Sequence, residues 1–195
     1  MRVFIAVLVL IFSLQSWTKA DDISDFEIEE ISIMDNLLDH FSKKIIIEAK
    51  NHAFIYPKSE KFITIKINQK KGEYDYFQFG IKPEDKNYVI YSLEGNKIYQ
   101  NNIKECIKQQ KIILDELKSF FPNAKMHTDN SPHNYDKSGK SFTYETYYLL
   151  KDGGSIGVFC YDWSENMFKE NGWADSLMIV IDTQEFSSFL TNEAY

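Results

Sequence analysis

The residues best suited to binding chemistry in this sequence gather in one short stretch near its C-terminal end. Residues 161–175 mix large aromatic side chains with carboxylates, namely Tyr161, Asp162, Trp163, Glu165, Phe168, Glu170, Trp173 and Asp175. Aromatic rings stack on sugar rings or anchor a protein partner. Because loops between strands commonly carry binding residues, we predict a loop here that binds through Tyr161, Asp162, Trp163 and Trp173.

Two other interpretations of this stretch stay open. Two of its carboxylates, from the set Asp162, Glu165, Glu170 and Asp175, would serve a small exported hydrolase as acid and base. In an acidic protein, however, such residues more often form a solvated face. The aromatic residues would alternatively cover one end of the core. No Gly-x-Ser-x-Gly elbow occurs in the sequence, and we assign no catalytic residue.

A tripeptide typical of phosphate-binding loops, Gly139-Lys140-Ser141, lies within the run DKSGKSF at 136–142. Such a loop needs a glycine five residues before its Gly-Lys pair, where this sequence has Asn134. It must also enter a helix, so that backbone N–H groups face the phosphates, whereas here a strand is predicted at 142–151. The pattern therefore argues against nucleotide binding, and we expect no cofactor.

The polar stretch 123–140 holds four residues that ligate metals in other proteins, His127, Asp129, His133 and Asp136. Their spacing matches no pair of ligands on one helix or hairpin, and three or four ligands must converge to hold zinc. We predict a solvated loop at 123–140 and no metal site.

The N-terminus has the layout of a secretory signal peptide. One arginine precedes an apolar run from Val3 to Leu14, and small residues end at Ala20 before the acidic Asp21-Asp22. A membrane anchor is the alternative, but a span needs about 20 apolar residues, which this run lacks. We predict cleavage after Ala20, a periplasmic or secreted chain 21–195, and no membrane span after cleavage.

Charge limits the classes of partner. The chain has a net charge of −7, and Arg2 is its sole arginine. Phosphate backbones and anionic lipid surfaces are bound by clustered cations, above all by the arginine fork. We therefore expect neither nucleic acid nor an anionic membrane surface as a partner, and the oligomeric state is left open.

Three capping patterns and a change of hydrophobic period outline the elements. Helices are predicted after Ser32-Ile33-Met34-Asp35, after Asn102-Ile103-Lys104-Glu105 as far as Phe121, and after Asp182-Thr183-Gln184-Glu185. Alternating runs predict strands at 62–68, 74–81, 88–93, 97–99, 142–151, 156–162 and 177–181. Short turns, including Glu94-Gly95-Asn96, join most of them and favour antiparallel hairpins.

This order predicts an α+β fold, an antiparallel sheet with helices packed on one face. Residues 21–195 would form one domain, with two α-then-β-meander halves at 21–100 and 101–195. The two cysteines, Cys106 on the second helix and Cys160 on a strand, would then form a disulfide in an oxidising compartment. Two buried free thiols are the alternative.

Several runs resemble a family of small exported proteins of unknown function from marine bacteria with AT-rich genomes. They are DFEIEEISIMDNLLDHF, NNIKECIKQQ, DKSGKS, CYDWSENM and the terminal NEAY. That family usually has glycine where this sequence has Glu30 and Met34. The resemblance implies export and no particular activity. In element order alone, the chain is also similar to outer-membrane assembly lipoproteins and β-lactamase inhibitor proteins.

Taken together, these patterns predict an exported binding or interaction module for an unknown protein or glycan partner. The contact surface would be the outer face of the sheet or the stretch 163–173. A structural role in the cell envelope is a third alternative, beside the hydrolase.

Overall fold

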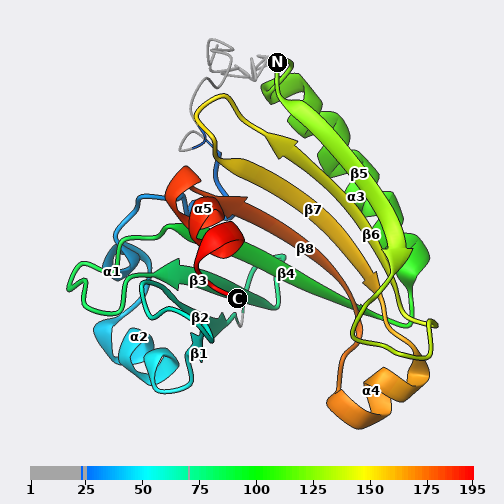
Figure 1. Cartoon of the computed structure of the whole chain (residues 1–195), viewed down its shortest axis with the longest axis horizontal. Helices are drawn as coiled ribbons and strands as arrows, with labels where there is room; N and C mark the ends of the chain where they lie inside the picture. Colours follow the sequence, from blue (N-terminus) through cyan, green and yellow to red (C-terminus); the bar gives the residue numbers. More distant parts are fainter. Residues whose placement is uncertain (1–22, 24–25, 70) are drawn as a thin grey trace, which may run out of the picture.

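A computed structural model describes residues 23, 26–69 and 71–195, so the predicted signal peptide at 1–20 lies outside the described residues. The chain forms one antiparallel sheet of eight strands in the order β1-β2-β3-β4-β8-β7-β6-β5, with helices around it (Figure 1). The predicted α+β class is confirmed. Among the described residues, no helix is both long and apolar enough to span a membrane.

The elements follow one another with short connections. The strands are β1 (Phe54–Ile55), β2 (Ile63–Asn68), β3 (Tyr76–Ile81), β4 (Ser92–Gln100), β5 (Lys125–Pro132), β6 (Phe142–Leu149), β7 (Ser155–Asp162) and β8 (Asp175–Asp182). The helices are α1 (Leu37–His40), α2 (Lys43–Lys50), α3 (Ile103–Phe120), α4 (Glu165–Asn171) and α5 (Gln184–Asn192). A helical segment followed by four strands occurs twice, with α4 between the third and fourth strands of the second set. The last strands of the two sets, β4 and β8, pair antiparallel.

Five local predictions were wrong. The polar stretch 123–140 contains strand β5, and the predicted loop at 163–173 contains helix α4. The predicted turn around Gly95 and the separate strand at 97–99 are both part of β4, whereas residues 88–91 belong to no strand. Gly95 is explained by close packing, because a Cβ there would lie 3.0 Å from the Tyr74 ring.

For two helices, the N-cap was predicted at a residue earlier in the chain than the one that caps the helix in the structure. Asp35 does accept the N–H of Ser32, at 3.0 Å, but this contact closes a turn, and Asn36 caps α1 instead. Thr183 rather than Asp182 caps α5. The cap at Asn102 was correct, since its side chain accepts the N–H of Glu105 and α3 begins at the next residue, Ile103.

One face of the sheet, here called the core face, is buried beneath α2 and α3. Alternate residues of five central strands point into one apolar cluster that also receives residues of both helices. From the strands these include Ile63, Ile65, Ile67, Phe77, Phe79, Ile81, Leu93, Ile156, Val158, Leu177, Ile179 and Ile181. A period of two with apolar residues on one side is the pattern of a half-buried strand.

Helix α3 is held on this face by a covalent bond and a polar clamp. Cys106 and Cys160 form the predicted disulfide, which closes a loop of 54 residues. One turn further along, the buried Gln110 side chain donates to the carbonyls of Tyr144 and Val158, at 2.8 and 2.9 Å. The helix is therefore fixed to both β6 and β7.

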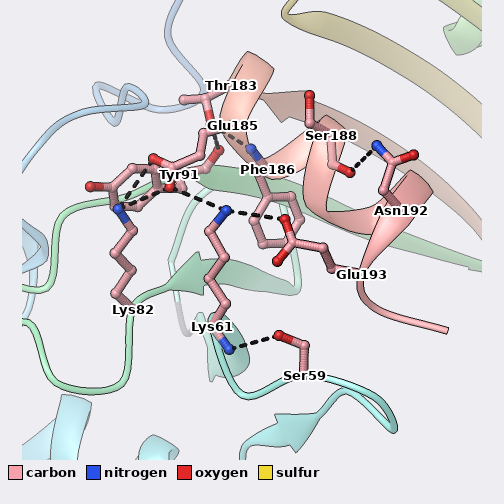
Figure 2. A network of polar contacts seen from close by, with 10 residues as sticks. All are labelled: Ser59, Lys61, Lys82, Tyr91, Thr183, Glu185, Phe186, Ser188, Asn192 and Glu193. Carbon is pink, nitrogen blue, oxygen red and sulfur yellow. Dashed lines mark hydrogen bonds and ion pairs between the residues drawn. The ribbon is translucent and has the colours of Figure 1, made fainter.

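Helix α5 packs on the opposite face, so the expectation of helices on one face holds for α2 and α3 but not for α5. Phe186 lies directly over Gly80, where a Cβ would come within 2.4 Å of its ring. Tyr56, Phe62 and Phe189 complete a second small core. Figure 2 shows the rim of this contact, in which Glu185 lies 3.6 Å from Lys61 and 3.1 Å from Lys82.

The entry to α1 contains strained backbone. Glu30 and Met34 have φ angles of 65° and 69°. A residue with a Cβ pays about 1 kcal/mol or more in this left-handed region. Met34 is also exposed, so removing its side chain costs little hydrophobic stabilisation.

We expect Met34→Gly to raise the free energy of unfolding by about 0.5 to 1 kcal/mol, because relief of strain exceeds the entropy that glycine adds to the unfolded chain. Urea denaturation measures this change. Met34→Ala is the matched control, since alanine removes the side chain and keeps the Cβ. Equal stability of the two variants would contradict the explanation by strain.

Candidate functional site: the open face of the sheet

The outer face of the sheet carries a broad surface that no described helix covers, here called the open face. It lies between α5 at one end of the strands and α4 at the other (Figure 1). By strand alternation its half-buried side chains are Tyr76, Gln78, Glu94, Glu145, Tyr147, Phe159, Tyr161, Met178 and Val180. They stand opposite the residues of the core face on the same strands.

Strands β7 and β8 make this surface unusual, because they are apolar on both faces. On β8, Ile179 points into the core while Met178 and Val180 point outward. On β7, Val158 is buried in the core and Phe159 lies beside Met178 on the open face. Strands that are apolar on both sides are typical of sheets covered on both faces. Here the second cover is missing among the described residues.

Polar side chains surround this apolar centre. Gln78 donates to the carboxylate of Glu94 on the neighbouring strand. Burial raises the pKa of Glu94. Lys66 lies with its Nζ 3.5 Å from the centre of the Tyr76 ring, and burial lowers the pKa of this lysine. An apolar centre with a polar rim is the layout of a protein interface.

An aromatic cluster adjoins the open face at its α4 end. The rings run from Phe159 through Tyr161 to Trp163, with centroids 6.4 and 5.9 Å apart, and Trp163 packs against Trp173 at 4.6 Å. His133, in the turn between β5 and β6, lies 4.4 Å from Trp163. The structure thus brings together three of the four predicted binding residues, Tyr161, Trp163 and Trp173.

Asp162 does not join them. It alternates with Tyr161 along β7 and pairs with Phe142, so it lies on the side of the core face. Burial raises its pKa, and burial followed by the charge of Asp162 raises the pKa of Asp175. Asp175 is buried and accepts the N–H of Trp163 at 3.0 Å, which is a structural role.

The other carboxylates proposed for a hydrolase lie apart from this pair. Glu165 is exposed on α4 and forms an ion pair with Lys169 at 3.3 Å, and Glu170 is exposed on the same helix. The four carboxylates are therefore divided between α4 and the ends of β7 and β8.

The run DKSGKS ties the β5–β6 turn to α4. Asp136 is buried and accepts hydrogen bonds from the N–H and hydroxyl of Ser141, at 3.0 and 2.7 Å, and from the hydroxyl of Ser164, at 2.9 Å. The backbone N–H of Ser164, which caps α4, in turn donates to Ser141 Oγ at 3.0 Å. These hydrogen bonds, led by that from Ser141, lower the pKa of Asp136.

The residues considered for a metal site are thereby separated. His127 and Asp129 lie on β5, whereas Asp136 is engaged by serines and His133 packs on Trp163. Among the described residues, no three His, Cys, Asp or Glu side chains converge on one point.

The outer sheet face was named as a possible contact surface, but of its side chains only Tyr161 was among the predicted site residues. One further signal for this face exists in the sequence. The runs SIGVFCY and LMIVI are apolar at both odd and even positions. Such runs predict cover on both faces, and one cover is absent from the described structure.

Comparison with known proteins identifies no relative. No family model matches the sequence, no curated protein matches it, and no solved structure matches the fold. The function must therefore be argued from the chain's own surface.

Ser141 is expected to be essential for the link between the turn and α4. Ser141→Ala removes two hydrogen bonds from a buried cluster and should lower the free energy of unfolding by about 1 to 3 kcal/mol. Ser119→Ala is the control and should change it little, because Ser119 is exposed on α3 and its hydroxyl donates only to the carbonyl of Asp115. Urea titration followed by tryptophan fluorescence tests both, and equal losses would contradict the assigned role.

Asp182 is buried where α5 meets the sheet, and its burial predicts an unusual pH dependence of the free energy of unfolding. Burial raises its pKa from 3.8 to about 7, and its Oδ1 has no hydrogen-bond partner among the described residues. The folded state therefore holds a proton that the unfolded state releases near pH 4, so stability falls as pH rises from about 4 to about 7.

We expect Asp182→Asn to be more stable than wild type above pH 8 by about 2 to 4 kcal/mol, with the difference vanishing below about pH 4. Denaturant titrations across this range measure it. Asp115→Asn, at an exposed position on α3, is the control. A variant less stable than wild type at pH 8 would show that the carboxylate is ionised and satisfied there.

Proposed function

We propose that this protein is an exported binding module that holds a protein partner on the open face. The observation that carries the proposal is the apolar character of β7 and β8 on both faces, with only the core face covered. Exposed apolar patches rimmed by polar residues mark interaction sites in soluble proteins.

The arrangement of side chains favours a protein partner over a glycan. Met178, Val180 and Phe159 form an apolar centre, and Gln78, Glu94 and Glu145 flank it. Apolar and aromatic anchors at the centre supply most of the binding energy in protein interfaces, and polar groups at the rim supply specificity. A glycan would instead use the rings at the α4 end, Tyr161 and Trp163.

Export is supported by three features of different kinds. The disulfide between Cys106 and Cys160 fits an oxidising compartment. The segment 1–20 has the composition of a secretory signal, and the resemblance to exported proteins of marine bacteria agrees with it. We place the protein in the periplasm or outside the cell.

A photo-reactive amino acid at Met178 tests the binding surface. In cells of the source organism we expect a discrete cross-linked adduct with a second protein, lost when Phe159→Asp is added. The same label at Ile112, exposed on α3, is the matched control and should give no adduct.

Two results would change the proposal. Glycan binding on an array, abolished by Tyr161→Ser while Met178 gives no adduct, would replace the protein partner with a sugar. Absence of both would contradict a binding role for the open face.

A further inference from the structure

Strand β5 ends the sheet with an open edge. It pairs with β6 alone among the described residues, and seven of its eight residues are exposed. Unpaired edge strands present a row of backbone donors and acceptors to any other strand of matching register.

The hydrogen-bond pattern shows which residues face this open edge. The N–H of His133 donates to the carbonyl of Ser141, in register with the β5–β6 ladder. Because hydrogen-bonded pairs alternate along antiparallel strands, the odd-numbered residues of β5 bond to β6. The backbone groups of Met126, Thr128 and Asn130 therefore point outward. Pro132 falls in the same series, where its missing N–H leaves no gap in the β6 ladder.

The side chains on the open-face side of β5 are complementary to themselves. In an antiparallel pair of β5 strands centred on Thr128, each His127 lies opposite the Asp129 of the second copy. On the core-face side of the strand, Met126 then lies opposite Asn130 and Thr128 lies opposite Thr128 of the second copy. A shift of centre to Asp129 would instead place the two Asp129 carboxylates opposite one another, which is unfavourable.

Asp129 gains from such a pairing. On its own sheet it lies directly opposite Glu145, and burial followed by the charge of Asp129 raises the pKa of Glu145. Like charges in this position destabilise a sheet. A histidine from the second copy would stand on the other side of Asp129 and donate a hydrogen bond to its carboxylate.

We propose that β5 pairs with β5 of a second copy, antiparallel about a two-fold axis through Thr128, to form a homodimer with one continuous sheet. The core faces of the two copies lie on one side of this sheet and the open faces on the other. The proposal does not depend on the function of the open face. Because edge pairing buries little area, we expect a dissociation constant in the range of about 1 to 100 µM.

Charge exchange tests both the surface and its register. Sedimentation velocity of the purified protein from about 1 to 500 µM should show a monomer–dimer equilibrium. His127→Asp and Asp129→His, made singly, should each weaken the dimer about 10-fold or more, since each places like residues opposite one another. The double variant H127D/D129H should restore it. Thermal melts should show that all three variants still unfold cooperatively, because both side chains are exposed and neither belongs to the core.

Cysteine cross-linking gives a second, geometric test. Thr128→Cys should form a disulfide-linked dimer under mild oxidation, since Cα atoms of a hydrogen-bonded pair lie about 5.5 Å apart. Asn130→Cys is the matched control, because the two copies of residue 130 would lie about 14 Å apart. A monomer at every concentration would overturn the proposal and leave the edge for another chain. A dimer insensitive to these changes would overturn it in favour of a different surface.

Discussion

The attachment of helix α3 to strands β6 and β7 determines which face of this sheet is buried. The Cys106–Cys160 disulfide and the two hydrogen bonds from Gln110 lie one helical turn apart on the same side of α3. Because each strand residue points to one face or the other, fixing the helix there fixes every core residue of β7 and β8. The opposite face then carries Phe159, Met178 and Val180, and its exposure follows from the position of α3.

A second, polar attachment organises the far end of the same face. Asp136 and Ser141 join the β5–β6 turn to the cap of α4, and this brings His133 against Trp163. The run DKSGKS, which contains the Gly-Lys-Ser of phosphate loops, thus holds the β5–β6 turn beside the aromatic cluster. In that cluster Trp163 and Trp173 pack on each other and are half-buried beside Tyr161.

The sequence predicted most elements that have one apolar face and missed β5 and α4, which have none. Within β4 it predicted a turn at Gly95, where close packing against Tyr74 explains the glycine. A clear hydrophobic period marks the strands at 63–68 and 76–81 and the helix from Ile103 to Phe120. The disulfide was predicted because Cys106 and Cys160 lie on the apolar faces of their elements. Strand β5 is exposed on both faces and α4 has no buried residue, so neither leaves a periodic signal. Of the predicted binding residues, Tyr161, Trp163 and Trp173 lie together and Asp162 lies apart from them. Whether β7 and β8 are covered on their second face depends on the arrangement of the helices, which the pattern alone does not show.

We propose that a partner covers the open face in the cell. Oxidative footprinting of Met178 and Tyr161, compared between the purified protein and the protein in its native compartment, tests this claim most directly. We predict that both residues are oxidised in the purified protein and protected in the cell, while the exposed Met126 on β5 and Met34 before α1 report the general access of the oxidant. Equal oxidation of Met178 in both settings would contradict the account.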